Sequence, residues 1–476
     1  DALMVTALAQ VVWWLVRAAL VATARTVWIG FRRPGLSLPA LALAALAVLG
    51  VRLGWLLPAT IAVVLGTVLG AWRRLHRPSF SRWVGLRARQ WWRRWLRYGA
   101  LWPFWMGRCG LTLTDEKTRK TVRPALVKVR CTPSVDRLLL KLPAGFKPDD
   151  VRGKRDELAH AMKAIDARVR RGKPRHVWLD LEVHNPLAAT IPAVPIPDRL
   201  SSEALDVDRL DGLVIGYADD GSPWRLRVRG SHVFIAGATG SGKGSIIWST
   251  LRALAPFIHA GLVQVWAIDP KGGMELEFGR DLFTRYERDD FASMVALLKD
   301  AAAAMDERCR RLRGTTRKFT PTPSTPLVLV LVDELATLTA LLPERKLLNE
   351  VESALGLLLT KGRAPGYCVV AAVQDVTKEV CRWRDLFPDR VALRLAKAIE
   401  VDMALGDGAY DAGAYCDAIP RSLPGIAYVL IEGHAEPVRV RAAYVTDDEI
   451  QQMARDYKPP RRLQSVDNDT EDGEAA

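Results

Sequence analysis

The 476-residue chain has little cysteine and histidine, and neither occurs in the spacings that hold metals. Its six cysteines are scattered without a Cys-x-x-Cys pair, and its seven histidines form no cluster. We therefore expect no zinc site, no disulfide and a reducing compartment. Acidic residues are nearly absent from residues 1–110, which contain 15 Arg, no Lys and one acid, Asp1. The net charge of +15 thus belongs almost entirely to this region, and the remainder is nearly balanced.

The same region contains long apolar runs. Between residues 36 and 72 the only charged residue is Arg52, which leaves two segments that approach the length needed to cross a bilayer. Arginines flank the stretch on both sides, so the positive-inside rule predicts a transmembrane helical hairpin over 36–72 with both ends in the cytoplasm. Residues 1–35 are apolar but interrupted by arginines. We interpret them as an interfacial helix, with a third span as the alternative.

From Trp72 to Gly110 the chain has ten Arg, seven Trp and no acidic residue. Arg and Trp together suit the anionic headgroup zone of a membrane, and they also suit the phosphates and bases of DNA. Because this juxtamembrane segment, 73–110, directly follows the apolar region, membrane lipid is the favoured partner and DNA is the alternative.

Residues 111–200 are predicted to form a small α/β module and a linker. Apolar patterning predicts strands at 125–130, 137–142 and 176–183 and an amphipathic helix at 149–171. Three prolines between residues 191 and 197 mark the linker. Nothing in this module points to catalysis.

The segment 237–245 fits the phosphate-binding loop template Gly-x-x-x-x-Gly-Lys, with an apolar strand before it and a helical pattern after it. Its backbone N–H groups would face a phosphate at a helix N-terminus, and Lys243 would reach the β and γ phosphates. Gly244 stands where a Ser or Thr normally coordinates Mg²⁺, so Ser245 is the nearest hydroxyl. The expected nucleotide-binding residues are Gly237, Ala238, Thr239, Gly240, Ser241, Gly242, Lys243, Gly244 and Ser245.

Two carboxylates follow the apolar run 327–332. Polar residues at the C-terminal end of a buried parallel strand face the ligand crevice of an open α/β sheet. We therefore expect Asp333 to hold Mg²⁺ through water and Glu334 to polarise the attacking water. Gln374 and Asp269 end two further apolar runs and should face the same crevice. Gln374 would sense the γ phosphate or orient water, unless it only satisfies loop backbone.

Five segments, in this order and spacing, resemble the motor domain of the FtsK/SpoIIIE family of membrane-anchored DNA translocases. They are GATGSGKGS, AIDPKGGMEL, LVLVLVDELATL, GRAPGYCVVAAVQD and FPDRVALRLA. The match covers roughly residues 212–444. The glycine after the lysine and the DPKGG extension are most similar to the conjugal transfer proteins of actinomycete integrative conjugative elements and plasmids.

The resemblance implies an α/β fold, a RecA-like P-loop motor with a parallel-rich central sheet over 201–445. From their residues, 446–476 are predicted to form a short helix and an acidic disordered tail. It implies ATP and Mg²⁺ as cofactors, double-stranded DNA as the substrate, and a homo-hexameric ring at the cell membrane with a cytoplasmic motor. It also implies that an arginine of a neighbouring subunit completes each ATP site. Arg390, Arg394 and Arg363 are the candidates, since a guanidinium suits bidentate phosphate contact.

Other functions share this machinery. A type IV coupling protein, which moves single-stranded DNA, also pairs a membrane hairpin with one such motor. A chromosome-partitioning translocase would carry a similar motor. A scaffold that binds ATP at the membrane without hydrolysing it is the third alternative, because Gly244 lacks the usual hydroxyl.

Overall fold

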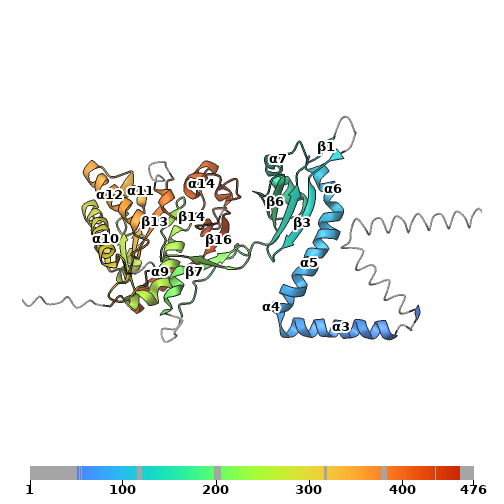
Figure 1. The fold of residues 1–476 in the computed structure, drawn as a ribbon, viewed down its shortest axis with the longest axis horizontal. Coiled ribbons are helices and arrows are strands. Elements are labelled where there is room, and N and C mark those ends of the chain that lie inside the picture. Colours follow the sequence, from blue (N-terminus) through green and yellow to red (C-terminus); the bar gives the residue numbers. More distant parts are fainter. Residues whose placement is uncertain are drawn as a thin grey trace, which may run out of the picture. The chain divides into compact units, whose positions relative to one another are not determined.

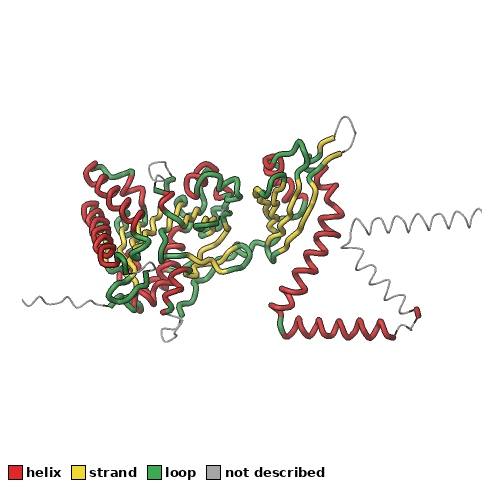
Figure 2. The backbone as a smooth tube through the Cα atoms, viewed as in Figure 1, coloured by secondary structure: helices red, strands yellow, loops and turns green. Residues whose placement is uncertain are grey.

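The structure is a computed structural model that falls into two compact units, Asp1–His184 and Asn185–Ala476. It describes residues 51–52, 54, 56–114, 121–197, 205–315, 319–376, 383–434 and 436–460. Figures 1 and 2 show the elements of each unit. The interfacial helix predicted for 1–35, most of the first predicted span and the predicted acidic tail lie outside the described residues.

The first unit opens with helices. They are α3 (Leu56–Leu75), α4 (Arg77–Phe80), α5 (Leu86–Trp92) and α6 (Gly99–Arg108), with the π-type turns η1 (Ser81–Gly85) and η2 (Arg93–Tyr98) between them. α3 includes the second predicted span and carries Arg73 and Arg74 in its last turn. Among the helices of the described ranges, none combines the length and the apolar character needed to cross a bilayer. The hairpin predicted over 36–72 is therefore not confirmed.

The Arg/Trp-rich segment is partly a core element. Trp102 and Trp105 on α6 are 5% and 7% exposed, and the Trp102 Nε1–H donates a hydrogen bond to the Pro124 carbonyl at 2.7 Å. Trp83, nearer the start of the segment, is largely exposed. Within the segment 73–110, the indole rings of α6 therefore pack in the apolar core of the first unit. Membrane lipid as the partner of this segment stays a prediction.

That sheet is antiparallel. Its four strands, in spatial order, are β3 (Ala125–Cys131), β4 (Val135–Lys141), β6 (His176–Glu182) and β5 (Asp166–Arg171), and a separate pair is β1 (Leu113–Thr114) with β2 (Thr121–Val122). Helices α7 (Pro148–Arg152) and α8 (Arg155–Ala161) precede β5. The helix predicted over 149–171 is therefore wrong at its end. The helical region stops near Lys163, which has a left-handed φ of 54°, and Ala167 and Val169 then alternate inward as in a strand.

The second unit contains a ten-stranded mixed sheet. Its parallel strands, in spatial order, are β11 (Arg285–Glu287), β10 (Val263–Ile268), β12 (Leu327–Val332), β13 (Tyr367–Val373), β9 (Val233–Ala236) and β14 (Asp389–Ala392). The antiparallel continuation is β15 (Ile426–Leu430), β16 (Val438–Ala442), β7 (Leu213–Ala218) and β8 (Pro223–Leu226). The predicted α/β fold with a parallel-rich sheet is confirmed.

Helices cover both faces of this sheet. The α-helices are α9 (Lys243–His259), α10 (Phe291–Leu312), α11 (Leu335–Thr339), α12 (Arg345–Lys361), α14 (Ala398–Leu405) and α15 (Asp447–Asp456). The single-turn segments are η4 (Val207–Asp211), η5 (Glu277–Leu282), η6 (Arg384–Leu386) and η7 (Cys416–Ala418). α9 and α15 share one apolar cluster with alternate residues of β12, and α10, α12 and α14 share the other. Because both faces are covered, the central strands are continuous apolar runs, and polar groups gather at their ends.

Candidate functional site

The loop between β9 and α9 has the backbone of a phosphate cradle. It turns at Gly240 and Gly242, whose φ angles of 69° and 101° lie in the left-handed region. A Cβ on Gly242 would lie 2.3 Å from the Gly425 amide nitrogen, so this position excludes any side chain for two reasons. α9 starts directly at Lys243, which places the unpaired N–H groups of a 17-residue helix at the loop.

Lys243 lies under this loop with its ammonium enclosed. The side chain is 8% exposed, and Nζ donates one hydrogen bond, to the Gly237 carbonyl at 2.7 Å. Burial lowers the pKa of Lys243 to about 8, which the charges of Glu334 and Asp333 only partly oppose. An ammonium can donate three hydrogen bonds, so the residue is suited to an incoming anion.

The two predicted carboxylates follow β12 and are both buried. Lys271 Nζ lies 2.8 Å from Asp333 Oδ2 and 3.6 Å from Glu334 Oε2. Burial raises the pKa of both carboxyl groups, and Lys271 works against that shift. For Lys271 itself, burial is outweighed by the Asp333 hydrogen bond and the two negative charges, and its pKa is raised. Lys271 therefore supplies the positive charge that pairs with Asp333 and Glu334 at the end of β12, a role that was not predicted from the sequence.

Gln374 connects the phosphate loop to the acidic pair. Its backbone N–H donates to Glu334 Oε1 at 3.1 Å, and its Oε1 accepts from Thr239 Oγ1 at 2.9 Å. β13, which ends at Val373 directly before Gln374, lies between β9 and β12 in the sheet. The structure thus brings together the loop, Lys243, both carboxylates and Gln374 as the sequence predicted.

The loop after β10 adds two charged side chains. Asp269 is fully buried and accepts backbone hydrogen bonds from Lys271 at 3.0 Å, Glu275 at 3.2 Å and Leu276 at 3.1 Å. The chain turns at Gly273, with φ 86°. Asp269 was predicted to face the crevice, but its carboxylate instead shapes this loop, which holds Lys271 and Glu275 toward the site. The two glycines that follow Lys271 in the sequence were the available signal for such a turn.

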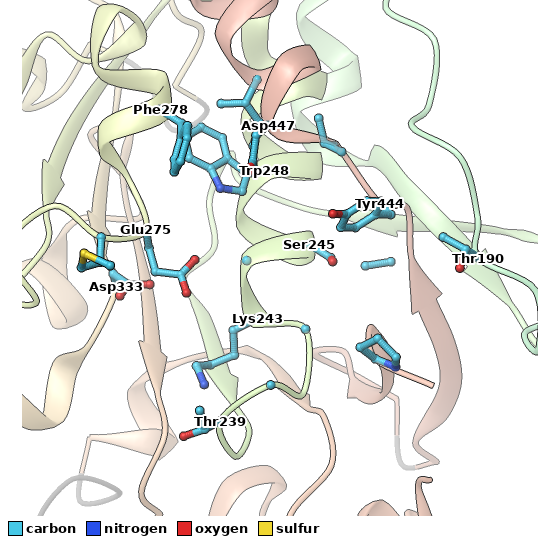
Figure 3. Close-up of a pocket in the computed structure, with 18 of the residues that line it drawn as sticks. Thr190, Thr239, Lys243, Ser245, Trp248, Glu275, Phe278, Asp333, Tyr444 and Asp447 are labelled. Carbon is cyan, nitrogen blue, oxygen red and sulfur yellow. The ribbon is translucent and has the colours of Figure 1, made fainter. Parts of the chain in front are cut away.

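A cavity of about 650 Å³ opens over these groups. One part is polar, with Lys243, Asp333, Glu275 and Gln374, as Figure 3 shows for the first three. Further along, the walls carry the rings of Trp248, Phe278 and Tyr444. A polar part beside an aromatic part matches the phosphates and the base of a nucleotide. No local sequence pattern indicates the aromatic wall, because Trp248, Phe278 and Tyr444 lie far apart along the chain.

Of the predicted finger arginines, Arg394 lies beside the cavity of its own chain. Its guanidinium donates to the Thr239 carbonyl of the phosphate loop at 2.8 Å, and its own carbonyl accepts from the Ala238 N–H at 2.9 Å. Arg394 therefore helps to hold the loop.

Arg363 and Arg390 lie elsewhere and line a separate hollow of about 470 Å³. Arg363 bonds the Gly230 carbonyl and Glu432, each at 2.8 Å, and Arg390 bonds the Leu405 carbonyl at 2.8 Å. Gly230 precedes β9, whereas the phosphate loop follows it. This hollow therefore lies at the N-terminal ends of the parallel strands, and the cavity lies at their C-terminal ends. The structure does not bring these two arginines to the cavity of their own chain.

Two family models match separate parts of the chain. Residues 217–324 match the FtsK/SpoIIIE family, and residues 70–183 match the actinomycete conjugal transfer protein N-terminal domain. The first range contains the phosphate loop and the Asp269 loop, and the second spans the helices and the four-stranded sheet of the first unit. The resemblance carried by the motifs is confirmed.

Curated relatives extend the similarity over most of the chain. The DNA translocase FtsK of Corynebacterium efficiens is 26% identical over 396 residues, which cover 76% of this chain and 39% of the relative. The DNA translocase SftA of Bacillus subtilis is 25% identical over 366 residues, which cover 72% of this chain and 36% of the relative. The matched segment spans less than half the length of these curated relatives.

Solved structures also show some likeness. The pCW3 conjugation coupling protein TcpA, in a monomer form with ATPγS, has 17% identity and a TM-score of 0.49, over 75% of this chain and 99% of that one. The cytoplasmic domain of the type VII secretion ATPase EccC of Thermomonospora curvata has 21% identity and a TM-score of 0.47, over 58% of this chain and 36% of that one. These low scores transfer no functional role to the present chain.

Proposed function

Because the chain joins an actinomycete conjugal transfer N-terminal domain to an FtsK/SpoIIIE-family segment, we propose that it is an ATP-driven DNA translocase of conjugal transfer. One observation carries the proposal: the phosphate loop, Lys243, Asp333 and Gln374 line one cavity, and Glu334 accepts a hydrogen bond from the Gln374 N–H beside it. The proposed substrate is double-stranded DNA, and the proposed working unit is a hexameric ring of identical subunits.

The phosphates of ATP are proposed to bind the loop 237–245. Backbone N–H groups at the start of α9 would donate hydrogen bonds to the phosphate oxygens, and the Lys243 ammonium would donate to the β and γ phosphates. The enclosed Lys243 ammonium supports this role, because a buried cation with unused donors gains most from a phosphate. The rings of Trp248 and Tyr444 would contact the base.

The residues also fit a Mg²⁺ ion held with the nucleotide. Asp333 is a buried carboxylate whose charge is balanced by Lys271. A buried carboxylate needs such a positive partner, and a metal ion could serve as a second one. Mg²⁺ prefers oxygen ligands and usually keeps several waters, which leaves one or two positions for the protein. When bound, it would neutralise charge on the β and γ phosphates. Asp333 would hold it through water, and Ser245 carries the loop hydroxyl that is nearest in sequence to Gly244.

Glu334 is proposed to polarise the attacking water. Its carboxylate is oriented by the Gln374 N–H at 3.1 Å, and burial raises its pKa, so it is a better proton acceptor than an exposed glutamate. Gln374 also accepts from Thr239 in the phosphate loop. A γ phosphate at the loop would compete for Thr239 and thereby reach Glu334 through Gln374.

An arginine of a neighbouring subunit is proposed to complete each site. Arg363 and Arg390 are the better candidates, because both line a hollow away from the cavity of their own chain. Arg394, which bonds its own phosphate loop, is proposed to act within its own subunit.

A membrane location is proposed from composition. The apolar runs and the 15 arginines of residues 1–110 suit an anchor on anionic lipid, with the motor on the cytoplasmic side. The finer topology, a hairpin over 36–72, remains a prediction.

Hydrolysis assays with three polymers test the function. We expect ATP turnover by the full chain to rise most with double-stranded DNA, less with single-stranded DNA and not with an unrelated protein. Stronger stimulation by single-stranded DNA would favour a coupling protein. ATP binding without turnover under all conditions would favour the scaffold.

Two variants test the site. Lys243→Ala should lose nucleotide binding, and Glu334→Gln should bind ATP, fail to hydrolyse it and accumulate as an assembled ring, measured by native mass with and without duplex DNA. Normal turnover in either variant would reject the assigned site.

A further inference from the structure

Gly244 is the one residue of the phosphate loop that departs from the usual pattern, and the structure shows what lies beside it. A Cβ built on Gly244 would be 3.2 Å from Glu275 Oε2, a tighter approach than side chains normally make. A Ser or Thr at this position would therefore press on the Glu275 carboxylate. The space that a loop hydroxyl would fill is bordered by a carboxylate oxygen from another loop.

We propose that Glu275 supplies the Mg²⁺-binding oxygen that the phosphate loop lacks at Gly244. The inference rests on the proposed nucleotide site and names the residue that completes it. Glu275 and Asp333 would then approach the ion from the loop after β10 and from the end of β12. The glycine and the glutamate act as a pair, since the glycine makes room for the carboxylate.

The position of Glu275 is fixed by the fold. Its backbone N–H donates to the fully buried Asp269, which also binds the N–H groups of Lys271 and Leu276. In Figure 3 the Glu275 carboxylate reaches into the cavity between Asp333 and the start of α9. Within the described residues no donor forms a hydrogen bond with this carboxylate. A rigid loop therefore presents an oxygen pair that is available to a ligand.

Electrostatics supports the assignment. Burial raises the pKa of the Glu275 carboxyl, and the negative charge of Asp333 raises it further, while Lys271 and Lys243 oppose the shift. Two carboxylates that disfavour each other's charge are a pair that a divalent cation stabilises, because Mg²⁺ is a hard cation that selects oxygen.

Ser245 is placed less well for this task. Successive residues of an α-helix point about 100° apart around its axis. Figure 3 shows the Ser245 hydroxyl on the side of α9 that faces Tyr444, away from Asp333 and Glu275.

The test measures how much Mg²⁺ strengthens nucleotide binding by the full chain. The dissociation constant of a fluorescent, non-hydrolysable ATP analogue is determined with Mg²⁺ and with EDTA, and the ratio is the Mg²⁺ gain. Glu275→Gln keeps the shape of the side chain but loses its charge, and should lower the gain by about tenfold or more. Retained binding in EDTA shows that the loop is still folded.

Two further variants sharpen the result. Asp447→Asn is the matched control, because Asp447 is also an exposed carboxylate at the rim of the cavity but lies beyond Trp248 in Figure 3. Its Mg²⁺ gain should match that of the unaltered chain. Combining Gly244→Ser with Glu275→Ala restores a hydroxyl where the shortened side chain no longer takes up room, and should recover part of the gain that Glu275→Ala alone loses.

Mn²⁺ gives a readout that does not depend on nucleotide fluorescence. The EPR signal of free Mn²⁺, titrated with protein and the same analogue, should show weaker Mn²⁺ binding in Glu275→Gln than in Asp447→Asn. A loss of Mg²⁺ gain in Ser245→Ala with none in Glu275→Gln would overturn the inference and leave the proposed function intact. Absence of nucleotide binding by the unaltered chain would overturn both.

Discussion

The four-stranded module and the nucleotide cavity both bury charged side chains, but they treat the charges in opposite ways. In the module, Asp136 is fully buried and is paired within the protein: Arg93 and Tyr98 bond its Oδ2, and Arg89 lies 3.9 Å from Oδ1, which accepts no hydrogen bond in the described residues. At the cavity, Lys243 and Asp333 are nearly as buried, yet both line an open space. In the module the buried charges pair with one another inside the protein. At the cavity, Lys243 and Asp333 remain accessible to a charged ligand.

The difference is visible in the ionisation of the cavity groups. Burial raises the pKa of Asp333 and Glu334 and lowers that of Lys243, so each charged form is held at a cost. Such shifts in a cleft are typical of functional sites, although structural ion pairs cause them too. Here a triphosphate would pair with Lys243, and its cation would pair with the carboxylates. In the module, the buried Asp136 is already paired with arginines of the protein.

The largest effect is expected where a closed cluster is broken. Asp136→Ala would leave the Arg93 guanidinium without its buried partner and should destabilise the first unit by about 3–5 kcal/mol. Denaturant unfolding followed by circular dichroism measures the loss. Asp149→Ala is the matched control, because the pair of Asp149 with Arg152 is solvent-exposed and should contribute at most about 0.5 kcal/mol. Nucleotide affinity should be unchanged in both variants.

At the cavity, a ligand should repair what a mutation removes. Lys271→Met would leave Asp333 and Glu334 without their cation and should cost about 2 kcal/mol of stability in the absence of nucleotide. Mg²⁺ with a non-hydrolysable ATP analogue should restore most of it, measured as the shift in Tm. Lys271→Arg keeps the charge and should lose much less. If the ligand failed to rescue Lys271→Met, the two regions would not differ in the way described.

The pH dependence of nucleotide affinity should follow Lys243. Burial lowers its pKa to about 8 in the free protein, and bound phosphates would raise it, so binding takes up a proton above pH 8. Affinity should be level below pH 8 and should fall by up to about tenfold per pH unit above it. Fluorescence titrations between pH 7 and 9.5 check this. Lys243→Arg stays charged throughout that range, so its profile should be flat, and a flat profile in the unaltered chain would contradict the assignment.

The sequence was sufficient for the parts of the site that depend on local order. A glycine-rich loop between a strand and a helix leaves few backbone paths, and carboxylates after a buried strand must lie at the edge of the sheet. Lys243, Asp333, Glu334 and Gln374 were therefore predictable as a group. The parallel-rich sheet was predictable for the same reason, since its central strands are continuous apolar runs.

Other features depend on contacts that no local pattern encodes. Glu275 approaches Gly244 from a different loop, and no local pattern predicts this contact. The sequence alone therefore indicates Ser245, the next hydroxyl along the chain, as the substitute. Trp102 and Trp105 belong to a segment whose Arg- and Trp-rich composition is typical of a membrane interface, but both rings are buried against protein. Composition does not distinguish these two apolar environments. Strand β5 was predicted as helix because it has only two apolar residues, Ala167 and Val169, and an alternation this short does not distinguish a strand from the end of a helix.

The smallest effect is expected for the contact that joins the phosphate loop to the acidic pair. Thr239→Val removes a 2.9 Å hydrogen bond to Gln374 at nearly constant side-chain volume, and should cost about 1 kcal/mol of stability without nucleotide. A double-mutant cycle with Gln374→Ala isolates this pair from other effects of either change. If a γ phosphate replaces Gln374 as the acceptor of the Thr239 hydroxyl, the coupling energy should disappear with a bound ATP analogue and persist with ADP. Equal coupling in both complexes would show that Gln374 only supports the loop.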